Sequence, residues 1–203
     1  MVDAAVQAEW DGRYAESDRL WSGNPNGALV HEVSDLPPGT VLDVGCGEGA
    51  DAIWLAKRGW QVTGLDVSTV ALDRAEQHAK DNDVAVTWVH SALADADLSQ
   101  FDLVTAHYPV IPRTPDQAGE RALLGAVTVG GTLLLVHHAG METHVPHDGG
   151  IDPNDYVWPS MVAAILDDDW DVEADEQRAR VVPDSGAGAH HRDDVVLRAR
   201  RLR

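Results

Sequence analysis

The chain has 203 residues, 44% of them hydrophobic, which is typical of one globular domain with a full core. Its formal net charge of −19 disfavours DNA, RNA and anionic membranes as partners, because so acidic a surface repels polyphosphates. No apolar run approaches the roughly 20 residues of a membrane span, and the amino terminus lacks a secretion signal, so we expect a cytoplasmic protein.

The amino-terminal part is predicted to be helical. An amphipathic helix is expected from Ala4 to Tyr14, and a second helix from Ala28 to Ser34. Between them lies a turn-rich loop that contains Trp21. The sequence Pro37-Pro38-Gly39 then breaks the chain before the first strand.

Strands and helices alternate from residue 40 onward, which predicts a parallel sheet with helices on both faces. The predicted strands are 40–44, 61–65, 84–90, 101–106 and 132–136, and the helices between them are 51–58, 68–81 and 116–127. A further helix is expected over 160–168, and 170–178 with 193–201 should form a closing hairpin. No repeat or linker divides the chain, so one domain is predicted over 1–203.

A glycine-rich turn is the most informative segment. An apolar strand runs into Gly45, Gly47 and Gly49, which permit positive φ and let a flat ligand lie against bare backbone. Asp66 ends the next apolar run, at about the spacing where a carboxylate accepts hydrogen bonds from both ribose hydroxyls. The pattern therefore predicts a nucleoside site.

The acids around this turn indicate which nucleoside binds. The glycine spacing formally fits a dinucleotide fingerprint, yet Asp43, Glu48 and Asp51 would crowd a pyrophosphate with negative charge. S-adenosylmethionine has no phosphate and carries ammonium and sulfonium cations, which suit these acids. A nicotinamide-dependent oxidoreductase on a similar sheet stays open as the alternative.

The sequences Asp43-Val44-Gly45-Cys46-Gly47-Glu48-Gly49 and Gly64-Leu65-Asp66-Val67-Ser68 resemble two motifs of class I S-adenosylmethionine-dependent methyltransferases. The resemblance implies an α/β fold: a doubly wound, mostly parallel seven-stranded sheet with a C-terminal antiparallel hairpin. It also implies a cofactor-binding core over 40–203 and a helical lid over 1–36. The layout looks like that of small bacterial methyltransferases of the tellurite-resistance and thiopurine type.

The same resemblance implies the cofactor contacts. Asp43, Gly45 and Gly47 would hold the methionine end, Asp66 the ribose, and the backbone of Ala92 and Leu93 the adenine. Ala92 stands where class I enzymes often carry an acid for the adenine amino group, so Ser91 and Asp95 are candidate substitutes. The remaining predicted contacts are Trp21, Cys46, Val67, Ser91 and Ala106.

The segment after the fourth strand faces the methyl group in this family, which makes His107 and Tyr108 the candidate catalytic residues. A histidine can take a proton from a nucleophile near neutral pH. Tyr108 could orient the acceptor by its hydroxyl or its ring. The alternative is that both residues only support the loop, since many methyl transfers need only proximity and in-line approach.

Four histidines follow the fifth strand: His137, His138, His144 and His147. They fit a solvated loop, an acceptor pocket or a metal site; their spacings form no compact ligand pair, so no metal is predicted. The sequence thus predicts a methyltransferase for a small-molecule acceptor, monomeric or homodimeric, without nucleic-acid or membrane partners. A cofactor-binding module without transfer activity is the non-enzymatic alternative.

Overall fold

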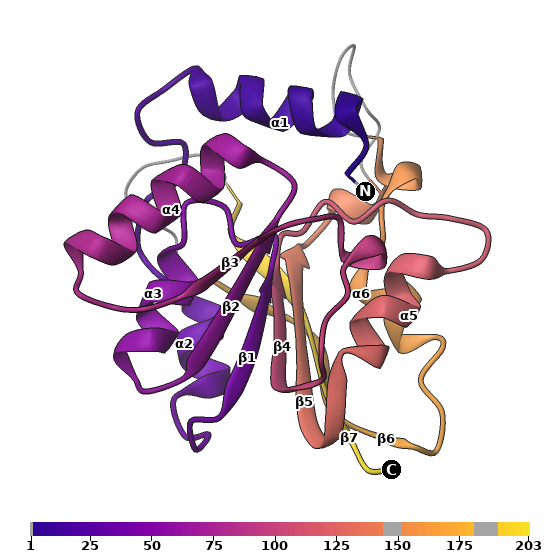
Figure 1. Ribbon diagram of the computed structural model, residues 1–203. Coiled ribbons are helices and arrows are strands. Elements are labelled where there is room, and N and C mark those ends of the chain that lie inside the picture. The colour runs from indigo at the N-terminus through magenta and orange to yellow at the C-terminus, as the bar shows by residue number, and fades with distance from the viewer. Residues whose placement is uncertain (1, 144–151, 181–190) are drawn as a thin grey trace.

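The computed structural model describes residues 2–143, 152–180 and 191–203, and its described strands form a seven-stranded sheet (Figure 1). The strand order is β3-β2-β1-β4-β5-β7-β6, with β7 antiparallel to both neighbours and the other pairs parallel. The strands are β1 (Thr40–Val44), β2 (Gln61–Asp66), β3 (Thr87–His90), β4 (Phe101–His107), β5 (Val127–His138), β6 (Trp170–Ala179) and β7 (Asp193–Arg201). The predicted fold class, with its antiparallel hairpin at the end, is confirmed.

The described helices alternate with these strands as the sequence predicts. They are α1 (Ala4–Ala15), α2 (Gly27–Val33), α3 (Ala50–Lys57), α4 (Thr69–Asp81), α5 (Ala118–Gly125) and α6 (Pro159–Ala163). Short 3-10 turns follow at η1 (Leu93–Asp95), η2 (Met141–Thr143) and η3 (Pro153–Asp155). Ser68 caps α4, because its hydroxyl accepts a hydrogen bond from the amide of Ala71.

Several predicted boundaries were wrong, most clearly around the two glycines before the fifth strand. Helix α5 ends at Gly125, and β5 already begins at Val127, which pairs with Phe101. The β4–β5 ladder is irregular between Phe101 and Leu103, and Gly130 has a φ of 84°. A Cβ at Gly131 would lie 3.0 Å from three backbone oxygens, so the glycines form a bulge inside the strand instead of ending it. Strand β3 and helix α6 are shorter than predicted.

The sheet has a hydrophobic core on each face. One core includes Leu29 of α2 and Leu55 of α3, while the other includes Leu123 of α5 and Val162 of α6. In Figure 1, α2, α3 and α4 lie on one side of the sheet, and α5 and α6 lie on the other. This two-sided covering explains why the central strands are almost continuously apolar.

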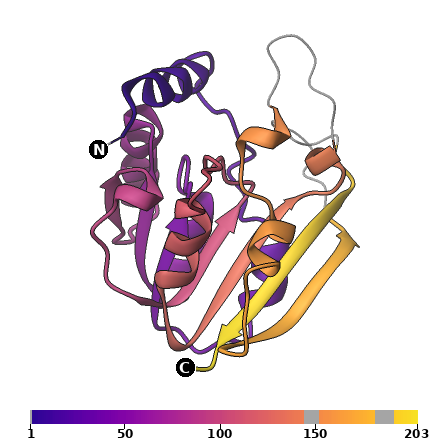
Figure 2. The same cartoon turned by 90° about the vertical axis from the view of Figure 1, so that its right-hand side faces the viewer.

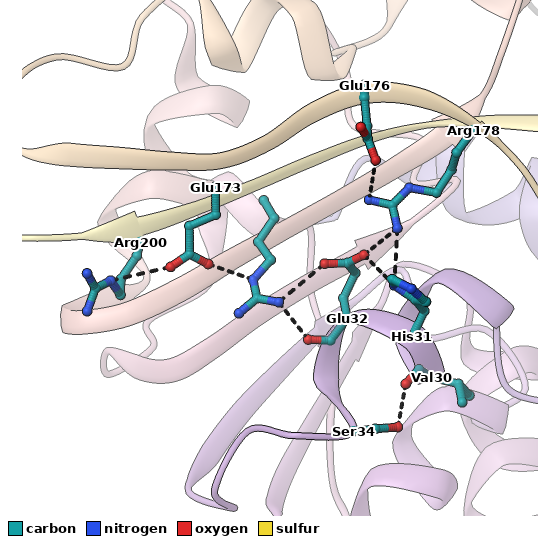
Figure 3. Close-up of polar contacts among 9 residues, drawn as sticks. Val30, His31, Glu32, Ser34, Glu173, Glu176, Arg178 and Arg200 are labelled. Carbon is teal, nitrogen blue, oxygen red and sulfur yellow. Dashed lines mark hydrogen bonds and ion pairs between the residues drawn. The ribbon is translucent and has the colours of Figure 1, made fainter.

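Helix α2 is tied to the distal strands by buried charge (Figure 3). The carboxylate of Glu32, of which 8% is exposed, forms ion pairs with Arg178 of β6 and Arg198 of β7. Arg198 also pairs with Glu173 at 2.7 Å. Arg198 and Arg200 alternate with Ala199 at strand spacing, a sequence pattern that predicts a solvated strand face. For Arg198 this prediction was wrong, because a carboxylate from the covering helix reaches it.

Helix α1 crosses one end of the molecule, beside α4 and above the ends of β1 and β2 (Figures 1 and 2). Its Asp11 accepts hydrogen bonds from the Ser68 hydroxyl at 2.6 Å and from the Val70 amide at 3.2 Å, so α1 contacts the first turn of α4. Within the ranges that the structure describes, no helix is long and apolar enough to cross a bilayer.

Candidate active site

The glycine turn is fixed to the end of β2 by backbone hydrogen bonds. The amides of Gly45 and Cys46 donate to the carbonyl of Leu65 at 2.8 and 3.1 Å, and the Gly47 amide donates to Asp66 Oδ2 at 2.8 Å. Gly47 has a φ of 52°, and a Cβ there would lie 2.9 Å from the Tyr14 hydroxyl. Glycine is thus required both by conformation and by the close approach of Tyr14, which belongs to the amino-terminal segment that the sequence predicts to be a lid.

A cavity of about 770 Å³ opens at this turn and extends under α1 to the end of β4. Most of the predicted site residues line it: Trp21, Asp43, Gly45, Cys46, Gly47, Asp66, Val67, Ala92, Leu93, His107 and Tyr108. Two do not line it. Ser91 donates its hydroxyl to the carbonyl of Ala92, and Ala106 is fully buried in the core. Asp95, the other substitute considered for the adenine acid, does line the cavity.

Three acids are buried side by side at the turn. Burial raises the pKa of Asp43 well above its usual range, and the neighbouring charges of Asp51 and Asp66 raise it further. Asp43 Oδ2 has no hydrogen-bond partner among the described residues. The pKa of Asp66 is raised by burial too, although hydrogen bonds from the amides of Ser68 and Gly47 oppose the shift. The arrangement favours a cationic or hydrogen-bond-donating ligand.

Two further acids at the turn hold the lid. Glu48 accepts hydrogen bonds from the amides of Leu20 and Trp21, each at 3.2 Å, and pairs with Arg74 at 3.0 Å. Asp51 accepts from the backbone amide and the side-chain amide of Asn26, both at 2.7 Å. Sequence reasoning treated Glu48 and Asp51 as charges for the ligand and missed this role. The signal was present, because backbone amides in a turn-rich segment such as 21–27 lack the regular partners of a helix or strand and require other acceptors.

The aromatic residues of the lid contact one another over the turn. The indole Nε1 of Trp21 donates to the Tyr14 hydroxyl at 3.0 Å, and Trp10 lies 6.3 Å from Tyr14 between ring centroids. Tyr14 is buried, whereas 37% of Trp21 is exposed. Both Tyr14 and Trp21 line the cavity, so the lid provides one of its walls.

His107 ends β4 and is buried against the first turn of α3. Its Nδ1 lies 3.3 Å from Asp51 Oδ2 and 3.1 Å from the hydroxyl of Thr105. Its Nε2 has no hydrogen-bond partner within the described ranges. Burial lowers the pKa of His107, although the charges of Asp51 and Asp194 oppose the shift, so the imidazole is neutral at physiological pH.

Tyr108 has a φ of 53°, a left-handed conformation that is rare for a bulky residue and common at functional sites. Its hydroxyl donates to Asp194 Oδ2 at 3.0 Å, and its ring stacks on His138 at 3.9 Å. Arg180 also pairs with Asp194, at 3.7 Å. Burial is the largest cause that raises the pKa of Tyr108. This phenol is therefore a neutral hydrogen-bonding group.

The histidines after β5 occupy different environments. His137 packs on Trp158 at 4.0 Å, and burial lowers its pKa to about 3, while His138 lines the cavity. His144 and His147 lie outside the described residues. Within the described ranges no three histidine, cysteine or acidic side chains are grouped so that they could hold a metal ion.

Comparisons with known proteins agree with this geometry. The family described as "Methyltransferase domain" matches residues 41–129. The ubiquinone biosynthesis O-methyltransferase of Alkalilimnicola ehrlichii is 36% identical over 121 residues, which cover 57% of this chain and 48% of that protein. The chain thus spans about half the length of this curated relative.

Solved structures share the fold. A protein from a study of the conversion of a disulfide bond into a thioacetal group during echinomycin biosynthesis has a TM-score of 0.73 at 22% identity, covering 97% of this chain and 91% of its own. The N-methyltransferase NodS from Bradyrhizobium japonicum, in complex with S-adenosylhomocysteine, has a TM-score of 0.63 at 20% identity, covering 87% and 84%. TehB from Haemophilus influenzae has a TM-score of 0.61 at 15% identity, covering 86% of this chain and 62% of its own.

The matched segment spans β1, the glycine turn and β2 with Asp66, which are the parts that form the nucleoside end of the cavity. The strand order, the motif and the sequence match agree, and together they support a class I S-adenosylmethionine-dependent methyltransferase.

Proposed function

We propose that this protein transfers a methyl group from S-adenosylmethionine to a small-molecule acceptor bound in the same cavity. The observation that carries the proposal is an oxygen of Asp43 that has no hydrogen-bond partner among the described residues and lies buried beside Asp51 and Asp66 at a bare glycine turn. A buried carboxyl group of this kind suits a ligand with an ammonium and a sulfonium, because nearby positive charge favours its ionised form, whereas a pyrophosphate would be repelled.

The cofactor roles follow from the places of the residues along the cavity. Asp43, Gly45 and Gly47 would hold the methionine end, Asp66 the ribose hydroxyls, and Ala92 with Leu93 the adenine. When bound, S-adenosylmethionine supplies an electrophilic methyl group, whose bond to sulfur breaks with its electron pair remaining on sulfur. The protein's own contribution is to align the acceptor and to exclude water from it.

The acceptor would lie between the lid, the segment after His107 and the end of β5. Support comes from the lining of this part of the cavity by Trp10, Tyr108, Ile111 and His138. These side chains combine apolar surface with a few polar groups, which is typical of small-molecule sites. The cytoplasmic location, the absence of nucleic-acid partners and a monomeric or homodimeric state belong to the same proposal.

Calorimetry separates the proposal from its nicotinamide alternative. S-adenosylhomocysteine should bind the purified protein with one site per chain, whereas NAD should give no measurable heat. A panel of hydroxylated, amine, thiol and chalcogen-oxyanion acceptors is then incubated with methyl-labelled S-adenosylmethionine. Tight NAD binding without S-adenosylhomocysteine binding would overturn the assignment. Cofactor binding without transfer to any acceptor would instead favour a non-catalytic module.

A further inference from the structure

Arg180, which directly follows β6, extends over the ends of β4 and β5. Its guanidinium carbon lies 5.2 Å from the centre of the Tyr108 ring, and its Nη1 lies 3.4 Å from His138 Nδ1. All three residues line the cavity, and only 9% of the Arg180 side chain is exposed. The guanidinium therefore belongs to the cavity wall at the end that we assign to the acceptor.

A buried guanidinium requires a compensating acid, and Asp194 of β7 provides it. Asp194 Oδ2 lies 3.7 Å from Arg180 Nε and accepts a hydrogen bond from the Tyr108 hydroxyl at 3.0 Å. The Asp194 side chain is 3% exposed and does not line the cavity, whereas Arg180 does. The pair thus presents its positive member to the cavity and keeps its negative member behind the wall.

Charge is distributed unevenly around the cavity. Its acidic side chains all come from the part of the chain that ends at Asp95: Asp3, Asp43, Glu48, Asp51, Asp66, Asp81 and Asp95. This part also contributes the cations Arg19 and Lys57. Among the described lining residues that follow Asp95, Arg180 is the only one with an aspartate, glutamate, lysine or arginine side chain. At the end formed by β4 and β5, an anion would therefore meet a fixed positive charge.

We infer that Arg180 binds an anionic group of the acceptor, which is therefore an organic acid that is methylated at another atom. The inference rests on the proposed function and narrows its substrate class. A guanidinium keeps its charge at physiological pH and matches the geometry of a carboxylate. Beside it the cavity is lined by the Tyr108 ring and by Pro109, Val110 and Ile111, which suit the carbon skeleton of such an acid.

The uneven charge would orient this acceptor. Its carboxylate is attracted to Arg180 and repelled by the acids of the glycine turn. The rest of the molecule then extends from Arg180 toward the cofactor, with its reacting atom nearest the methyl group. A neutral acceptor of the same shape gains nothing from Arg180, so the site should prefer an acid to its amide.

Binding can be measured without turnover. Protein saturated with S-adenosylhomocysteine is titrated with matched probes, each a carboxylic acid and its primary amide: the hydroxybenzoates with the hydroxybenzamides, and indole-3-acetate with indole-3-acetamide. The ¹H–¹⁵N signal of Arg180 Nε, assigned with Arg180→Lys, should shift on addition of an acid and not of its amide. Arg180→Gln should weaken binding of the acids by about 10- to 100-fold and leave binding of the amides and of S-adenosylhomocysteine unchanged.

The matched control is Arg178→Gln. Arg178 lies on the same strand, but its guanidinium pairs with Glu32 in the network of Figure 3, and it does not line the cavity. This variant should lose stability and keep the preference for acids. A change of preference in Arg180→Gln alone therefore separates acceptor binding from a structural role.

Three results would each overturn the inference: equal wild-type affinity for acids and amides, unchanged acid affinity in Arg180→Gln, or binding of none of the acids. Methylation of selenite, an oxyanion without a carbon skeleton, with no organic acid methylated would overturn it too. Binding of acids at Arg180 without methyl transfer to any acceptor would instead contradict the proposed function and leave the anion site standing.

Discussion

At the scale of single residues, the acids at the glycine turn have separate tasks although the sequence presents them as one cluster. Glu48 and Asp51 accept hydrogen bonds from the lid, whereas one oxygen of Asp43 has no partner in the part of the chain that the structure describes, and Asp66 joins the turn to β2. The ligand-directed charge is therefore concentrated on Asp43 and Asp66.

Replacing Asp66 by alanine should weaken S-adenosylmethionine binding by about 1.5–3 kcal/mol, because two charge-assisted hydrogen bonds to the ribose are lost. Titration calorimetry measures the change in Kd. The exposed Asp73→Ala on α4 is the control and should bind as the wild type does. An unchanged Kd in Asp66→Ala, with the fold intact by circular dichroism, would remove Asp66 from the ribose.

Asp43 should make cofactor binding release a proton. Burial and the charges of Asp51 and Asp66 raise its pKa above 3.8 in the ligand-free protein. A cationic ligand favours the carboxylate, so binding lowers that pKa. Calorimetry in buffers of different ionisation enthalpy, repeated across the acidic pH range, should show the release, and Asp43→Asn should abolish it.

The raised pKa of Asp43 also makes the stability of the fold depend on pH. Since the folded pKa of Asp43 exceeds the unfolded one, its contribution to folding is present below about pH 3.8 and is lost as the pH rises through the folded value. Asp43→Asn should therefore flatten the fall of the unfolding free energy with rising pH in the ligand-free protein. Equal slopes for the two proteins would mean that Asp43 titrates normally.

At the scale of elements, the lid is held by hydrogen bonds to acids as well as by apolar burial. Asp11 joins α1 to α4, and Glu48 and Asp51 accept hydrogen bonds from the segment between α1 and α2. Most of these contacts are partly exposed, so the lid should open locally at a lower free energy than the sheet.

Hydrogen exchange tests how the lid depends on the ligand. Amides between Trp10 and Asn26 should gain protection on addition of S-adenosylhomocysteine, because Trp10, Tyr14 and Trp21 line the cavity. Burial of one such aromatic contributes roughly 1.5–3 kcal/mol. Strand β5 serves as the internal control and should change little. Equal protection with and without ligand would make the segment ordinary core packing.

The charge network of Figure 3 should matter for stability rather than for binding. In Glu32→Gln, Arg178 and Arg198 lose their shared carboxylate. Because both arginines are about a quarter exposed, the loss in unfolding free energy should be about 1–3 kcal/mol, below the value for a fully buried pair. Chemical denaturation measures it. Glu76→Gln, in an exposed pair with Lys80, should cost less than about 0.5 kcal/mol.

At the scale of the whole molecule, a net charge of −19 and several buried acids would attract divalent cations non-specifically. We nevertheless expect no stoichiometric metal. Elemental analysis of protein purified without a histidine tag should give substoichiometric zinc, nickel and manganese. One bound equivalent that disappears in His144→Ala or His147→Ala would contradict this expectation and favour a metal-assisted acceptor.

The sequence by itself determined the fold class, because the apolar runs, the glycine turn and Asp66 are local patterns whose physics does not depend on distant residues. Strands 40–44 and 193–201 were predicted within their observed bounds, and most predicted cofactor residues do line one cavity. The sequence-based prediction of the strand's start failed at Val127, where β5 begins before its two glycines. A bulge at glycines depends on pairing with the neighbouring strand and not on local propensity.

Only the tertiary structure decided which groups work together. Asp51 and His107 are far apart in the chain, and they meet because β1 and β4 are adjacent parallel strands whose ends share one edge of the sheet. Likewise Asn26 reaches Asp51, and Arg198 reaches Glu32, only after α2 packs on that sheet. Side-chain orientation, burial and hydrogen-bond partners depend on these long-range contacts, and therefore the chemistry of the site was decided by packing.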